Sequence, residues 1–154
     1  MLDEEVAVQI DYSLNMEQMI LADRYDHVGP FLRNNEPIQG RISGNGIVTA
    51  NLALVHIDRI ISTDGALSAI QNLKLVPAGL EHLLAFALER PDLQRQIFVA
   101  ALGSIWQRAT DSKKDDRCAP FIWGDVKRRC LSLHWIGMNW PDKYYRFLAV
   151  RPTI

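Results

Sequence analysis

Residues 80–88 read LEHLLAFAL, and this stretch carries the clearest helical pattern in the chain. Its four leucines and Ala87 recur at intervals of three and four positions, so they form one apolar stripe along a helix. Pro91 follows the stretch, and a proline disfavours the helical conformation in the residue before it. The pattern therefore predicts a helix that ends before Pro91.

Two shorter helices are predicted earlier in the chain. Asn15 and Gln18 have the spacing of a capping box, which indicates a helix of about two turns directly after Asn15. Ser62 is followed by further capping residues and then by apolar residues at helical spacing, so a second helix is expected over 64–73. The segment between these helices and before the next strand, 25–46, is rich in Gly, Pro and Asn and is expected to be an irregular connection.

Alternating apolar and polar residues predict strands on both sides of these helices. In the C-terminal half, two strands are expected to form a hairpin that turns near Gly124, with Leu131, Leu133 and Trp135 pointing inward. The predicted strands are 6–12, 47–61, 96–102, 121–123, 130–135 and 145–150.

The order of these elements predicts an α+β fold, because helices come early and strands crowd the C-terminal half. We expect an antiparallel sheet with three short helices. A length of 154 residues fits one domain, 1–154. It would consist of a strand, helix, loop and strand over 1–61 and a second part over 62–154.

Charge and cysteine content restrict the function classes. The chain has 17 basic and 18 acidic side chains, a net charge of −1, so nucleic acid is not an expected partner. No apolar run approaches the roughly 20 residues that span a bilayer, and the first residues are acidic, unlike a secretory signal. Cys118 and Cys130 are expected to be free thiols. We therefore expect a cytoplasmic protein without a membrane contact, a metal or a cofactor.

Several short phrases in the C-terminal half carry a resemblance to a known fold. Residues 73–83, LKLVPAGLEHL, match a family phrase of the type GLRLPTxxEL at Leu75, Pro77, Glu81 and Leu83. Residues 102–106 and 146–151 stand where that family has two of its strands. Residues 73–151 thus resemble the C-type-lectin-like fold of bacterial proteins related to formylglycine-generating enzymes.

The resemblance implies the fold of the C-terminal half and no activity. The enzymes of that family use paired cysteines, whereas Cys118 and Cys130 lie in a different context. Calcium-binding lectins use Glu-Pro-Asn and Trp-Asn-Asp phrases. Residues 139–142, NWPD, match only part of the second phrase, and Asn35-Glu36-Pro37 lies outside the matching half. The N-terminal half, which opens on VQIDYS over 8–13, resembles a bacterial protein family. This resemblance implies no activity either.

The sequence offers no complete catalytic motif. His56 and Asp58 lie two positions apart on one predicted strand face and could orient an imidazole. With Glu81 and His134 they form the candidate set for an enzyme whose site is assembled only in three dimensions. Ser104 follows a glycine but lacks the Gly-x-Ser-x-Gly elbow of a nucleophilic serine.

Aromatic residues are concentrated in the last third of the chain. Loop aromatics beside charges are typical of binding surfaces, and the segment 140–145, WPDKYY, precedes the last strand. We therefore expect Trp140, Asp142 and Tyr144, together with Trp123, to form a contact surface. The leading hypothesis is a non-catalytic binding or assembly module for a protein or a small ligand. The alternatives are the enzyme described above and a homo-oligomeric structural protein.

Overall fold

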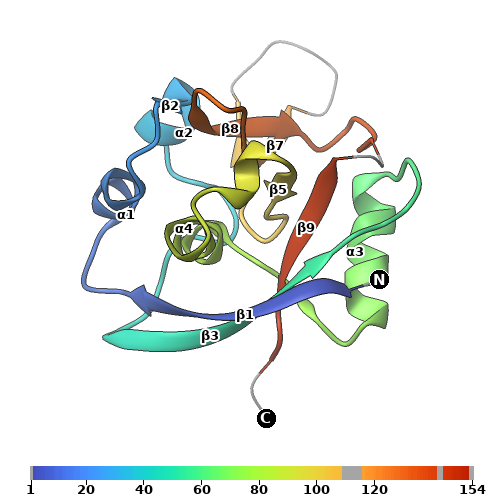
Figure 1. Cartoon of the computed structure of the whole chain (residues 1–154), viewed down its shortest axis with the longest axis horizontal. Coiled ribbons are helices and arrows are strands. Elements are labelled where there is room, and N and C mark those ends of the chain that lie inside the picture. Colours follow the sequence, from blue (N-terminus) through green and yellow to red (C-terminus); the bar gives the residue numbers. More distant parts are fainter. Residues whose placement is uncertain (1, 109–115, 142–143, 153–154) are drawn as a thin grey trace.

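The computed structural model describes residues 2–108, 116–141 and 144–152. Within these ranges the chain forms four α-helices and one sheet of nine strands (Figure 1). The helices are α1 (Met16–Asp23), α2 (Pro30–Asn34), α3 (Thr63–Asn72) and α4 (Leu80–Glu89), and the 3-10 turn η1 covers Leu93–Arg95. The strands are β1 (Leu2–Asp11), β2 (His27–Val28), β3 (Ile47–Val55), β4 (Val76–Pro77), β5 (Phe98–Ala100), β6 (Trp106–Gln107), β7 (Arg117–Gly124), β8 (Arg129–Trp135) and β9 (Tyr145–Val150).

The sheet is mixed, and its main order is β1-β3-β9-β5-β7-β8-β2. The two remaining short strands join it at the side, β4 beside β9 and β6 beside β7. β5 runs parallel to β9, and β2 runs parallel to β8. The prediction of an α+β fold is confirmed, whereas the prediction of an antiparallel sheet is wrong at these two pairs. Each parallel pair joins strands that lie far apart in the sequence, and an alternation pattern does not encode such pairing.

Local signals placed several elements correctly. Val8 and Ile10 of β1 are buried while Ala7 and Gln9 are exposed, as the alternation predicts. The capping box at α1 is present, because the Asn15 side chain accepts from the Gln18 backbone N–H and the Gln18 side chain accepts from that of Asn15, both at 2.9 Å. The predicted boundaries of the last strand are those of β9.

Three local predictions are wrong. α2 is a fourth helix inside the expected irregular connection, where Pro30 occupies its first turn. β3 ends at Val55 rather than near Ile61, and Ile61 instead makes an isolated bridge to Trp140. In β8, Trp135 was expected to point inward, but it is 36% exposed. Leu131 and its neighbour Cys130 are both fully buried, because the sheet is covered on both faces at that end of the strand.

Helices cover the two faces of the sheet at different places. On one face, α1 and α4 pack against the side chains of β1, β3 and the central strands, including Val8, Leu52 and Ile122. On the other face, α3 packs against β9 and its neighbours, including Phe147 and Val55. Figure 1 shows β9 running between α4 and α3. No helix in the described part of the chain is long and apolar enough to cross a membrane.

Candidate functional site: an aromatic face of the sheet

Five aromatic side chains from four parts of the chain meet on the face of the sheet that carries α3, in an area that α3 does not cover. Strand register places them there. Phe121 of β7 is directly opposite Ser132 and next to Ala100, and Phe98 lies two positions before Ala100 on the same face. The set, which we call the aromatic face, consists of Phe98, Phe121, Trp123, His134 and Tyr144.

The rings form a connected array. The Phe98 ring lies 6.3 Å from Phe121, 6.0 Å from Tyr144 and 5.1 Å from the buried Tyr145, measured between centroids. Phe121 and Trp123 are alternate residues of β7, and their rings are nearly parallel, with an interplanar angle of 19° and a separation of 6.5 Å. The edge-to-face contacts around Phe98 hold each ring in a defined orientation.

The aromatic face remains partly open to solvent. The Tyr144 residue is 48% exposed. Phe98, Phe121, Trp123 and His134 are half-buried. A row of large apolar side chains that is accessible on one side and packed on the other is typical of contact surfaces.

Trp140 forms the buried base of this surface. Its ring stacks on His134 at 4.0 Å and contacts Tyr145 at 5.1 Å, and the residue is fully buried. The indole N–H donates to Thr63 Oγ1 at 2.9 Å, and that hydroxyl donates to the Ile136 carbonyl at 2.7 Å. Trp140, which the sequence analysis expects in the contact surface, is therefore enclosed by protein in the structure. Its backbone pairing with Ile61 draws the loop into the core instead.

The β7–β8 turn brings a cation to one end of the aromatic face. Asp125 Oδ1 accepts the backbone N–H groups of Lys127 and Arg128, which fixes the turn and lowers the pKa of Asp125. The Arg128 guanidinium then lies 5.3 Å from the centre of the Trp123 ring, within cation–π distance. The Trp123 indole N–H donates to Ser132 Oγ at 3.0 Å, which holds the ring in place.

His134 acts as a neutral aromatic group in this array. Burial lowers the pKa of His134, and the contact with the Trp135 carbonyl only partly opposes that effect. His134 Nδ1 lies 2.8 Å from this carbonyl oxygen, which can only accept, so Nδ1 carries the proton and donates. His134 thus contributes ring stacking rather than charge.

The structure brings together part of the predicted contact surface. Trp123 and Tyr144 both belong to the aromatic face, and Trp140 lies beneath it. Asp142 lies outside the described residues. Phe98 and Phe121 were missed. The alternation of Phe121 with Trp123 along one strand is a sequence signal that could have identified Phe121.

The four residues of the enzyme hypothesis do not form one site. Glu81 is in the first turn of α4, where its carboxylate accepts from the Tyr12 hydroxyl at 3.2 Å. His134 lies on the opposite face of the sheet, and His56 and Asp58 follow the end of β3. Among the described residues, no group of three His, Cys, Asp or Glu side chains could hold a metal ion.

Ser104 has a structural role. Its hydroxyl is fully buried, accepts the Leu80 backbone N–H at 2.8 Å and donates to the Gly40 carbonyl at 2.8 Å. It therefore satisfies one of the free N–H groups at the start of α4 and ties that helix to the loop before β3. These two hydrogen bonds leave no hydroxyl proton for a catalytic base to remove.

No protein-family model, curated protein or solved structure matches this chain. The resemblance to the C-type-lectin-like fold therefore rests on the short phrases quoted above.

Proposed function

We propose that this protein is a non-catalytic binding module and that the aromatic face is its contact surface for a protein partner. The observation that carries the proposal is the array of partly exposed rings on a rigid base, with Arg128 at one end. Trp, Tyr and Arg supply most of the binding energy in protein interfaces when they are clustered and held in place.

The charge balance supports a protein rather than a nucleic acid as the partner. Single-stranded nucleic acids also stack on aromatic side chains, but their binding draws on a positively charged groove. The chain has a net charge of −1, and the turn that presents Arg128 also carries Asp125. A protein surface with apolar side chains matches this mixture of rings and balanced charges better.

Two further expectations belong to the same proposal. The C-type-lectin-like relation is supported by α4, which begins inside the matching phrase, and by β9, which contains most of the closing one. A cytoplasmic location is supported by Cys118 and Cys130, which are both buried free thiols.

Photo-crosslinking tests the contact surface directly. We expect p-benzoylphenylalanine in place of Tyr144 to form an adduct with a protein from an extract of the source cells. The same group in place of Val76 is the matched control, because Val76 is 49% exposed but lies on β4, away from the aromatic rings. The adduct should resist nuclease and should be absent from the control.

The captured protein is then purified and its affinity measured. Tyr144→Ala should weaken binding at least tenfold, whereas Val76→Ala should change it less than twofold. A nuclease-sensitive adduct would identify a nucleic acid ligand, and an adduct of twice the chain mass would identify a homo-oligomer. Either result, or no adduct beyond the control, would contradict a protein partner at this face.

A further inference from the structure

The open edge of β1 adjoins a cleft that the proposed function does not use. β1 is the terminal strand of the sheet, and β3 is its only neighbour among the described strands. One row of its backbone N–H and C=O groups therefore points away from the sheet over ten residues. Such a row is a template for an added strand.

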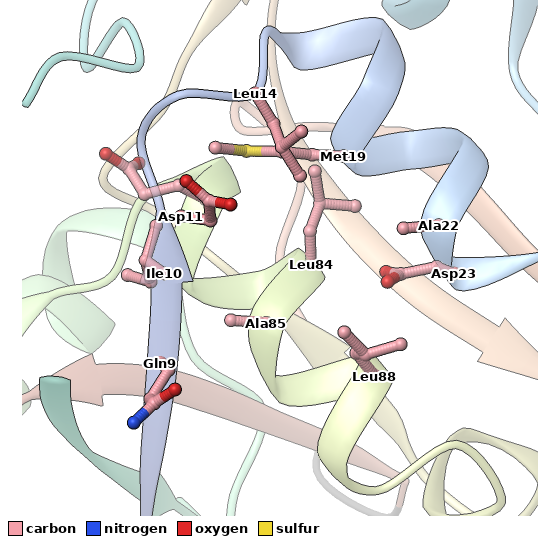
Figure 2. Close-up of a pocket in the computed structure, with 11 residues that line it drawn as sticks. Gln9, Ile10, Asp11, Leu14, Met19, Ala22, Asp23, Leu84, Ala85 and Leu88 are labelled. Carbon is pink, nitrogen blue, oxygen red and sulfur yellow. The ribbon is translucent and has the colours of Figure 1, made fainter. Parts of the chain in front are cut away.

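Two helices extend past this edge and form the cleft beside it. Figure 2 shows the cleft between β1, which carries Gln9, Ile10 and Asp11, and α1, with Leu84, Ala85 and Leu88 of α4 facing it. Its volume is about 90 Å³. A larger cleft of about 440 Å³ continues along the same edge from Asp11 towards Ala7 and shares Ala85 and Leu88.

A large apolar side chain beside this edge is exposed. Leu88 of α4 lines both clefts and is 58% exposed. An additional strand beside β1 would lie under α4 and cover Leu88. Burial of this side chain would stabilise the added strand beyond its backbone hydrogen bonds.

The ionisable side chains that line the two clefts are all acidic. Asp11, Asp23, Glu81 and Glu89 line them, and no Lys, Arg or His does. Asp23 and Glu81 are almost fully buried, and burial raises the pKa of both carboxyl groups. A nearby cation would offset this cost of burying a carboxylate.

We propose that the edge of β1 accepts an extended peptide segment as an additional strand, with apolar side chains against Leu88 and Lys or Arg side chains beside Asp11 and Glu89. A second copy of this chain fits less well, because its own β1 would bring another Asp11 to an acidic edge, whereas Glu4 and Glu5 already pair with Arg90 and Arg151. This surface is separate from the aromatic face, and the proposal does not depend on the proposed function.

A displayed library of random twelve-residue peptides tests the proposal on the full chain. We expect enrichment of sequences in which apolar residues alternate with others and in which Lys or Arg outnumbers Asp and Glu. Leu88→Lys should weaken binding of the enriched peptides at least tenfold. Leu21→Lys is the matched control, since Leu21 is also 58% exposed on a helix but does not line either cleft, and it should change binding less than twofold.

The geometry of strand addition has its own signature. N-methylation of alternate peptide residues on the edge that faces β1 should abolish binding, and methylation of the intervening residues should leave it within threefold. Four results would overturn the proposal. Both methylated peptides could lose binding equally, the library could enrich acidic peptides, it could enrich no peptides, or Leu88→Lys could leave binding unchanged. A dimer in light scattering that Leu88→Lys dissociates would overturn it as well, in favour of a second copy.

Discussion

Asp23 is a carboxyl group enclosed by protein at the end of α1. It is only 5% exposed, and burial raises its pKa from 3.8 to about 7. The Tyr25 hydroxyl donates to it at 2.8 Å, and this hydrogen bond and the charge of Arg129 lower the pKa without cancelling the effect of burial. The folded chain therefore holds a proton at Asp23 over a pH range in which the unfolded chain has released it.

This difference makes stability depend on pH in a defined direction. The contribution of protonated Asp23 is fully present below about pH 4 and is lost as the pH rises to about 7, because the folded pKa is the higher one. Asp23→Asn keeps an acceptor for Tyr25 and removes the titration. Its free energy of unfolding relative to the wild type should rise by up to about 4 kcal/mol between pH 4 and pH 8.

Urea denaturation at several pH values measures this change. Asp92→Asn, at a side chain that is 84% exposed, is the control for the substitution itself. A constant difference between Asp23→Asn and the wild type across this pH range would show that Asp23 has an ordinary pKa in the folded chain.

The loop before β3 has no regular secondary structure, but close backbone contacts hold it in place. Gln39 and Ile105 form an isolated bridge, and Gly40 lies directly against Gly103. Gly40 has φ +66°, and a Cβ atom there would lie 1.8 Å from the Gly103 carbonyl oxygen. Gly46 has nearly the same conformation, φ +68°, with no atom within 4 Å of its Cβ position.

Alanine substitutions at Gly40 and Gly46 separate the cost of a positive φ from the cost of a steric clash. Gly46→Ala should cost about 1 kcal/mol of stability, because an L residue disfavours positive φ. Gly40→Ala should lower stability by at least twice this amount, because the loop must also move away from Gly103 and so from the Ser104 hydroxyl that donates to the Gly40 carbonyl. Thermal unfolding of both variants measures the difference. Equal destabilisation would mean that the contact between Gly40 and Gly103 contributes nothing.

At the scale of elements, the sequence predicted what neighbouring residues decide. The alternation around Val8 and the Asn15–Gln18 capping box identified β1 and α1, because both signals lie within a few residues. The five-residue helix α2 was missed, since it is shorter than a reliable periodic pattern and lies among turn-forming residues. The burial of Trp140 was not predicted, because it depends on pairing with Ile61, which is 79 positions earlier in the chain and leaves no local signal.

At the scale of the molecule, the sheet joins the two parts that the sequence analysis distinguished. β9 pairs with β3 from residues 1–61 on one side and with β5 from 62–154 on the other. α4 packs over β1, and Leu83 of α4 shares one hydrophobic cluster with Val8 and Leu52. Each part thus covers apolar surface of the other.

This arrangement predicts that neither part folds alone. In an isolated 62–154 fragment, β9 would lose its pairing with β3, and the α4 face that contacts β1 would be open to water, at about 25 cal/mol per Å² of apolar surface. The fragment should show no cooperative urea transition and should bind the dye ANS. An equimolar mixture with a 1–61 fragment should restore the cooperative transition, because the two parts then rebuild the shared sheet. A cooperative transition of 62–154 by itself would instead make it an independent domain, and the β3–β9 pairing would then be a contact between two folded units.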